Sequence, residues 1–266
     1  GSSLGMGGAL FHILNHATFK MLLFLCMGAV IYATGQREIA KLGGLGKRMP
    51  ITVLTFGIGA LAISGIPPFN GFASKAMLAS AISGNILLKA VLIITAAGTL
   101  ASFLKLFLHV FAGKPPITLE KTKEVPFLMC LAMFVLAGLC LAIGILPNFV
   151  LKDFVAPAVG LSLKFDFWKI KYFIETLIIV LLGISIYMFG MRFGLLKVQA
   201  SGKANKVSLI SYFSLDRLYC GIAALVEALF NLIKSVMRRS INIYSLWIFL
   251  TLAVLLFVLW YGSFLW

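Results

Sequence analysis

The chain has 266 residues, of which 61% are hydrophobic and only 12% are charged. A soluble domain of this length needs far more polar surface, so the composition excludes a soluble protein and indicates several membrane-spanning helices. A formal net charge of +15 is typical of nucleic-acid binders, but lysine and arginine also gather in cytoplasmic loops and at anionic lipid headgroups. We therefore expect a multi-pass protein of the cytoplasmic (inner) membrane that contacts lipid and no nucleic acid.

The first predicted span, residues 9–34, carries three titratable side chains within an apolar run. His12, His16 and Lys20 stand four residues apart, so they line one face of a helix. Three such groups on one buried face are costly in hydrocarbon, and side chains one turn apart can pass protons through intervening water. A polar stripe that packs against a neighbouring subunit is the simpler alternative. A basic loop follows at residues 35–50.

The second predicted span, residues 51–82, is interrupted by the sequence Ser64-Gly-Ile-Pro-Pro-Phe-Asn-Gly-Phe-Ala-Ser-Lys75. Pro67 and Pro68 cannot donate backbone hydrogen bonds, and Pro67 also disfavours helical geometry at Ile66. Non-helical backbone survives within hydrocarbon only where it is buried in protein or lines a wet cavity. A broken helix that carries an ionisable residue is therefore a candidate functional site.

Lys75 is the ionisable residue of this break, and we expect it to begin the second half-helix. Unpaired amides at a helix start repel a cation, and burial also disfavours the charged form of an amine. A lysine held in this way can load and release a proton, as a reversible proton carrier requires. The alternative is an interfacial lysine that snorkels from a helix end to the membrane surface.

Four further spans are expected after a short turn at residues 83–85, and they lie at 86–112, 125–146, 172–196 and 244–266. Lys105 and His109 repeat the four-residue spacing, and we include them in the candidate path. Lys105 is also close enough to the following polar loop to reach it by snorkelling. Lys89 and Glu175 stand near the ends of their spans, where we expect interfacial charges.

Residues 214–239 differ in pattern from the spans, because apolar side chains recur at three- and four-residue steps while charged residues occupy other faces. This pattern is typical of an amphipathic helix that lies along the membrane surface. The predicted fold is therefore an all-α polytopic membrane protein with about six transmembrane helices, one of them discontinuous, plus an amphipathic lateral helix. Its expected segments are 1–112 around the broken helix, 113–196 with two further spans, 197–240 with a basic loop and the lateral helix, and 241–266 with the last span.

Several motifs occur together in the order and spacing of a known family. They are Phe11-His-Ile-Leu-Asn-His16-Ala-Thr-Phe-Lys20, Leu42-Gly-Gly-Leu45, Met49-Pro50 and Gly65-Ile-Pro-Pro-Phe-Asn-Gly-Phe-Ala-Ser-Lys75. In these residues the chain resembles the antiporter-like subunits shared by respiratory complex I, Mrp-type sodium/proton antiporters and group 4 membrane-bound hydrogenases, the proton-conducting transporter superfamily. The stretch Phe213–Tyr219 resembles the start of the lateral helix that the longest such subunits carry.

This resemblance implies both a fold and a set of site residues. Family members are built around two inverted helix repeats, and this chain is similar to their C-terminal half. A neighbouring membrane subunit would then supply the missing antiporter half, and the lateral helix would link neighbouring subunits. The proton-translocation path that the resemblance implies runs through Lys75, Lys20, His16 and His12, and we extend it to Lys105 and His109.

The sequence contains no phosphate-binding loop, no GxGxxG motif and no cluster of nucleophiles. Its cysteines form no CxxC pair and fall in or beside apolar runs, where we interpret them as packing residues: Cys26, Cys130, Cys140 and Cys220. We therefore expect no cofactor and no metal on this chain. Any redox module would lie elsewhere in the complex.

Together these features favour an ion-translocating, antiporter-like subunit of a multisubunit, redox-driven membrane complex. The chain would move H⁺, Na⁺ or both along buried lysines and histidines, as a component of a translocating oxidoreductase with no redox chemistry of its own. Two alternatives stay open. One is a non-transporting structural subunit that anchors its neighbours through the lateral helix, and the other is a stand-alone secondary antiporter.

Overall fold

The structure is a computed structural model that describes residues 3–160, 165–192, 227, 228 and 231. The chain divides into two units, residues 1–201 and 202–266, and the helices discussed below all belong to the first. The expected last span, 244–266, lies outside the described residues, as does almost all of the expected lateral helix at 214–239. The regular elements of the described part are all helices.

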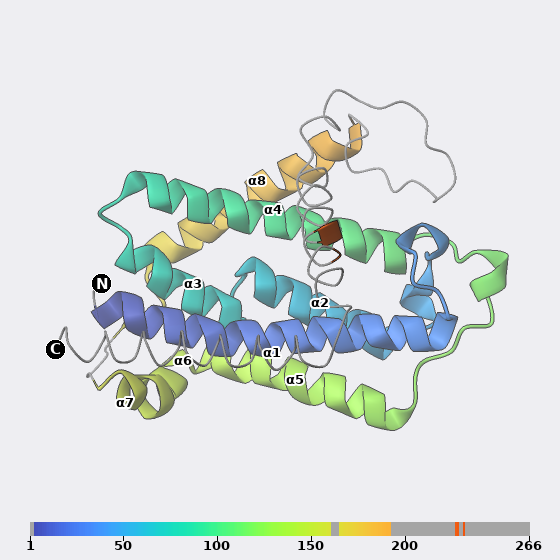
Figure 1. Cartoon of the computed structure of the whole chain (residues 1–266), viewed down its shortest axis with the longest axis horizontal. Helices are drawn as coiled ribbons and strands as arrows, with labels where there is room; N and C mark the ends of the chain where they lie inside the picture. Colours follow the sequence, from blue (N-terminus) through green and yellow to red (C-terminus); the bar gives the residue numbers. More distant parts are fainter. Residues whose placement is uncertain (1–2, 161–164, 193–226, 229–230, 232–266) are drawn as a thin grey trace, which may run out of the picture. The chain divides into compact units, whose positions relative to one another are not determined.

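Four described helices are long and apolar enough to cross a membrane, and these are α1 (Ser3–Thr34), α4 (Ile86–Phe111), α5 (Phe127–Ile145) and α8 (Ile170–Arg192). The shorter helices α2 (Pro50–Ser64) and α3 (Asn70–Ala81) follow one another where the discontinuous span was predicted. The structure thus confirms an all-α, multi-pass membrane protein. In Figure 1, α1 begins at the end of the bundle where α3 ends and α4 starts.

The break between α2 and α3 has the cause that the sequence predicted. Gly65 caps α2 in the left-handed conformation at a φ of 81°, which costs glycine little because it has no Cβ. Its N–H bonds to the carbonyl of Ala62. The peptide bond between Pro67 and Pro68 is cis, and helical structure resumes only at Asn70.

Two glycines allow other backbone to approach this break closely. A Cβ at Gly71, in the first turn of α3, would collide with the carbonyl oxygen of Ala62 in α2. A Cβ at Gly144, near the end of α5, would collide with the carbonyl oxygen of Pro68. Because α1, α2 and α5 all pack against α3, protein covers much of the non-helical segment, although Pro68 itself is exposed.

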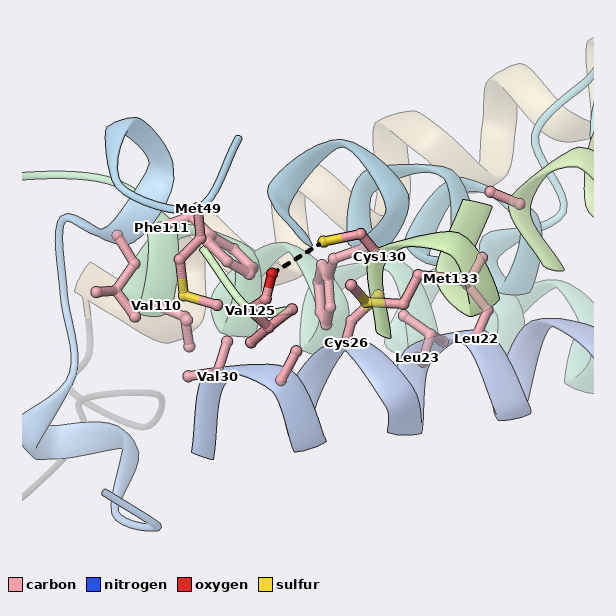
Figure 2. Packing of buried hydrophobic residues seen from close by; sticks show 14 of the residues in the cluster. Leu22, Leu23, Cys26, Val30, Met49, Val110, Phe111, Val125, Cys130 and Met133 are labelled. Atoms are coloured by element: carbon pink, nitrogen blue, oxygen red, sulfur yellow. Dashed lines mark hydrogen bonds between the residues drawn. The ribbon is translucent and has the colours of Figure 1, made fainter. Parts of the chain in front are cut away.

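The core beside the break is filled by α1, α2 and α5 together with the C-terminal end of α4 (Figure 2). Cys26 of α1 and Cys130 of α5 are both buried in this cluster and are free thiols. Cys26 Sγ lies 3.4 Å from the hydroxyl of Thr55, and Cys130 Sγ lies 3.4 Å from the carbonyl of Val125. These contacts fit the packing role expected for the cysteines.

The segment after α5 is more regular than its mixed sequence suggests. It comprises α6 (Pro147–Val150), η4 (Leu151–Val155), which has π-helical hydrogen bonding, and α7 (Ala156–Val159). Residues 165–168, which follow a stretch outside the described residues, are not helical.

The start of α2 is stabilised by a carboxylate from the segment just before α5. Glu124, just before α5, accepts hydrogen bonds from the backbone N–H groups of Ile51 and Thr52 at 2.8 and 3.2 Å. Its other oxygen accepts from the Thr52 hydroxyl at 2.6 Å. A carboxylate at this position satisfies orphan amides and complements the positive end of the helix dipole.

Replacing Glu124 with alanine should therefore destabilise the protein by about 1–2 kcal/mol, the usual cost of losing a helix N-terminal cap. Glu120, which is exposed in the preceding turn, provides a matched control, and Glu120→Ala should leave stability unchanged. Thermal unfolding of the purified membrane protein measures both variants. Equal melting temperatures for the two would show that the cap contributes nothing.

Candidate ion pathway at the helix break

A cavity of about 670 Å³ lies between α1, α3 and α4, next to the break. Four of the six predicted site residues line it: His12, His16 and Lys20 from α1 and Lys75 from α3. Three hydroxyls from α4 complete its polar lining: Thr95, Thr99 and Ser102. Each of these hydroxyls donates a hydrogen bond to a carbonyl one turn earlier in α4, so each oxygen can still accept one from water.

Lys75 lies beside the break, but in a different setting from the one that its sequence position predicted. It is the sixth residue of α3 rather than the first, and its Nζ donates a hydrogen bond to the carbonyl of Ile63 at 2.7 Å. The amine therefore contacts the carboxyl end of α2, not the free amides of α3. The prediction that Lys75 begins the second half-helix was wrong, because α3 already begins at Asn70. The Lys75 side chain then extends back across the break to the end of α2.

Gly65 makes this reach possible. A Cβ at that position would lie 2.8 Å from Cδ of Lys75, so a side chain there would push the lysine away from Ile63. The same glycine provides the positive φ that ends α2. Gly65, which has no side chain, therefore allows both the end of α2 and the position of the Lys75 amine.

His12 connects α1 to α3. Its Nδ1 forms a 2.9 Å hydrogen bond with the hydroxyl of Ser74, which is fully buried. One turn along α1, the ring of His16 has its centroid 5.8 Å from that of His12. His16 is exposed at the rim of the cavity, which differs from the fully buried face that the spacing predicted. His12, His16 and Lys20 share one face of α1 as expected, but α4 covers only part of that face.

Lys20 lines the cavity one further turn along α1. Its Nζ lies 5.9 Å from the centroid of the Phe103 ring on α4, a distance suited to a cation–π interaction. Lys105 and His109 lie farther along α4 and are not among the residues that line this cavity. His109 Nδ1 is 2.8 Å from the backbone carbonyl of Lys105 rather than from its amine.

Sequence analysis missed a buried pair of asparagines at the break. Asn15 of α1 and Asn70 of α3 are both fully buried, and Asn70 Nδ2 donates to Asn15 Oδ1 at 3.2 Å. Asn70 Oδ1 and Asn15 Nδ2 have no partner, although buried amides usually find one. The signal available in the sequence was an asparagine between two histidines of an apolar run.

An ion pair was also missed, because its two members were interpreted as separate interfacial charges. Lys89 Nζ of α4 lies 2.6 Å from a carboxylate oxygen of Glu175 in α8. The two side chains are 34% and 18% exposed, so neither is a fully solvated charge at a helix end. Only the packing of α8 against α4 brings them together, and no local pattern encodes it.

Comparison with known proteins identifies relatives of this chain. Residues 1–105 match the family described as NADH:quinone oxidoreductase/Mrp antiporter, TM. The chain is 36% identical over 199 residues to the Na⁺/H⁺ antiporter subunit A1 of Staphylococcus aureus (strain MRSA252), a match that covers 66% of this chain and 25% of the relative. It is 35% identical to the same subunit of strain N315 over the same length. The chain thus spans about a quarter of the length of the curated relatives it matches.

Two solved structures share the fold. The membrane-bound sulfane sulfur reductase, an archaeal respiratory membrane complex, contains a chain that is 27% identical, with a TM-score of 0.62, and the match covers 96% of this chain and 48% of that one. The Mrp complex of Dietzia sp. DQ12-45-1b matches with the same TM-score at 24% identity, covering 96% and 28%, which supports the fold alone. Over residues 1–105 the chain is thus similar to the membrane subunits that NADH:quinone oxidoreductases share with Mrp antiporters, and the solved relatives have the same fold.

Proposed function

We propose that this chain is an ion-translocating, antiporter-like subunit of a multisubunit membrane complex, and that H⁺, Na⁺ or both pass through the cavity beside the helix break. The observation that carries the proposal is the presence of four titratable side chains, from two helices, around one cavity of about 670 Å³. Ionisable groups inside a membrane are expensive and mark ion pathways. Relatives named as Na⁺/H⁺ antiporter subunits support the same function.

In this proposal Lys75 is the central carrier. Its amine receives a proton through water in the cavity from His12 or His16, and holds that proton while it donates to Ile63. A neutral imidazole both accepts and donates protons, so the two histidines can pass a proton along α1. Lys20 lines the same cavity one turn after His16 on α1, and Lys105 and His109 would continue the path along α4 toward the opposite membrane face.

The proposal includes partners. His16 is exposed at the cavity rim, and an imidazole facing hydrocarbon is costly, so we infer that another membrane subunit covers this side. That subunit would present an antiporter-like half to this side. Lipid would surround the remaining apolar surface, and the lateral helix would link neighbouring subunits. Where the complex is redox-driven, as in the respiratory relative, the redox module would lie on other chains of a complex in the cytoplasmic membrane.

The proposal is tested in membrane vesicles that contain the assembled complex. An imposed Na⁺ gradient or the electron donor of the complex starts transport, a fluorescent dye reports H⁺, and ²²Na⁺ reports sodium. Lys20→Ala should lower ion flux at least about tenfold, because a positioned proton-transfer group is lost. Lys41→Ala, in an exposed loop, is the control and should change nothing.

Co-purification of the other membrane subunits with both variants will show whether assembly is unchanged. If Lys20→Ala transports as well as the parent complex does, the cavity is not the pathway. The chain would then be the structural subunit of the alternative function. Flux that follows only the Na⁺ gradient, and never an electron donor, would identify an antiporter rather than a redox-driven pump.

A further inference from the structure

A second, smaller cavity lies on the other side of Lys75, between α3, α4 and α8. Its volume is about 30 Å³, enough for about two water molecules. Lys75, Leu92 and Ala96 line both cavities, so Lys75 stands between them. The other polar groups of the small cavity are Lys89 of α4 and three residues of α8: Tyr172, Glu175 and Thr176.

The Lys89–Glu175 ion pair lies between Lys75 and one face of the membrane. Lys75 is six residues before the end of α3, about 9 Å along the helix, whereas Lys89 is three residues after the start of α4, about 5 Å. Figure 1 shows that the end of α3 and the start of α4 lie at the same end of the bundle. An ion leaving Lys75 in this direction meets the pair before it meets bulk water.

The remaining polar groups of the small cavity are less suited to accept an ion. The Tyr172 hydroxyl donates to Ser80 at 3.3 Å, and Thr176 is nearly buried. A neutral hydroxyl neither binds an additional proton nor releases its own near neutral pH, whereas a carboxylate can be protonated and deprotonated. Glu175 is therefore the only acidic side chain among the residues that line this cavity.

We propose that Glu175 and Lys89 form the outlet of the ion path on this side of the membrane, an inference that rests on the proposed function. A proton leaves the Lys75 ammonium through water in the small cavity and binds the Glu175 carboxylate, so Lys75 becomes neutral and Glu175 becomes a carboxylic acid. This step breaks the ion pair with Lys89. Glu175 then releases the same proton to bulk water, and Lys89 binds the carboxylate again, which closes the outlet.

An ion pair that only holds α4 against α8 would behave differently when it is removed. Replacing a buried or half-buried ion pair by apolar side chains of similar volume is often neutral or stabilising for folding. The double variant Lys89→Met/Glu175→Met should therefore assemble normally. A structural pair would then leave transport intact, whereas an outlet that needs a titratable carboxylate would stop working.

The experiment compares three variants of the assembled complex in vesicles. Lys89→Met/Glu175→Met should lower coupled ion flux at least about tenfold, because the acceptor of the proton is gone. Glu38→Met/Lys41→Met removes the exposed loop pair, which is 3.0 Å apart, and should keep full flux. Native gels and thermal unfolding monitor assembly and stability in parallel, and both should match the parent complex.

Lys75→Ala, measured in the same series, separates the proposed ion path through Lys75 from the proposed outlet at Glu175 and Lys89. Full flux in Lys75→Ala would reject the proposed function itself. Loss of flux in Lys75→Ala with full flux in Lys89→Met/Glu175→Met would reject only the outlet. Should the double variant fail to assemble, Glu175→Gln replaces it, since glutamine keeps the volume and a hydrogen bond to Lys89 but does not titrate; full flux in that variant would equally reject the outlet.

Discussion

Replacing Lys75 with alanine will lower ion flux about 100-fold, the lower end of what a positioned proton-transfer group contributes. The physical reason is that Lys75 is the residue that lines both cavities and carries a titratable group there. Without an amine between them, no group accepts the ion from the large cavity and passes it to the small one. Flux in vesicles that contain the assembled complex measures the effect.

Two further variants make this prediction specific. Lys75→Ala also leaves the Ile63 carbonyl without its donor, which can cost about 1–3 kcal/mol of stability. Lys75→Gln keeps an N–H donor for that carbonyl but cannot carry a proton, so it should assemble well and still lose flux. Lys152→Ala, exposed on η4, is the control for removing a lysine. Normal flux in Lys75→Gln would reduce Lys75 to a structural donor.

Replacing Gly144 with alanine will lower the stability of the protein by about 1–3 kcal/mol, as expected for overpacking in a closely packed core. Its new Cβ would collide with the carbonyl of Pro68, which belongs to backbone that cannot move without displacing α3. Gly138, two turns earlier on the same helix, has no other atom near the position of a Cβ. Gly138→Ala should be neutral or stabilise by up to about 1 kcal/mol, because alanine favours helix.

Thermal unfolding of the purified complex compares the two glycine variants directly. Gly71→Ala should behave like Gly144→Ala, since its Cβ would meet the carbonyl of Ala62. If Gly144→Ala and Gly138→Ala unfold at the same temperature, then α5 does not pack tightly on the break.

The sequence was sufficient for features that depend on local chemistry. Two prolines after a glycine predicted the break at its observed place, because missing N–H groups and forced dihedral angles act within a few residues. The four-residue spacing of His12, His16 and Lys20 predicted one shared face, because helix geometry depends only on residue number. The structure brings these residues and Lys75 around one cavity.

Features that depend on contacts between distant segments were missed. Glu124 caps a helix that begins more than seventy positions earlier in the chain, and Lys89 pairs with a carboxylate from a helix two spans later. The sequence also predicted the wrong neighbours for the Lys75 amine. Which backbone groups the amine contacts depends on the path of the chain through the prolines, and not on the number of residues between Lys75 and the prolines. No local pattern encodes such contacts, and an ion pair across two helices reads as two interfacial charges.

The measurement that tests the central claim most directly is ion flux in Lys75→Arg. Arginine keeps the positive charge and can donate to the Ile63 carbonyl, but its guanidinium does not release a proton in proteins. The complex should therefore assemble, with flux as low as in Lys75→Ala. Flux equal to that of the parent complex would contradict proton loading and release at Lys75, and with it the ion path described above.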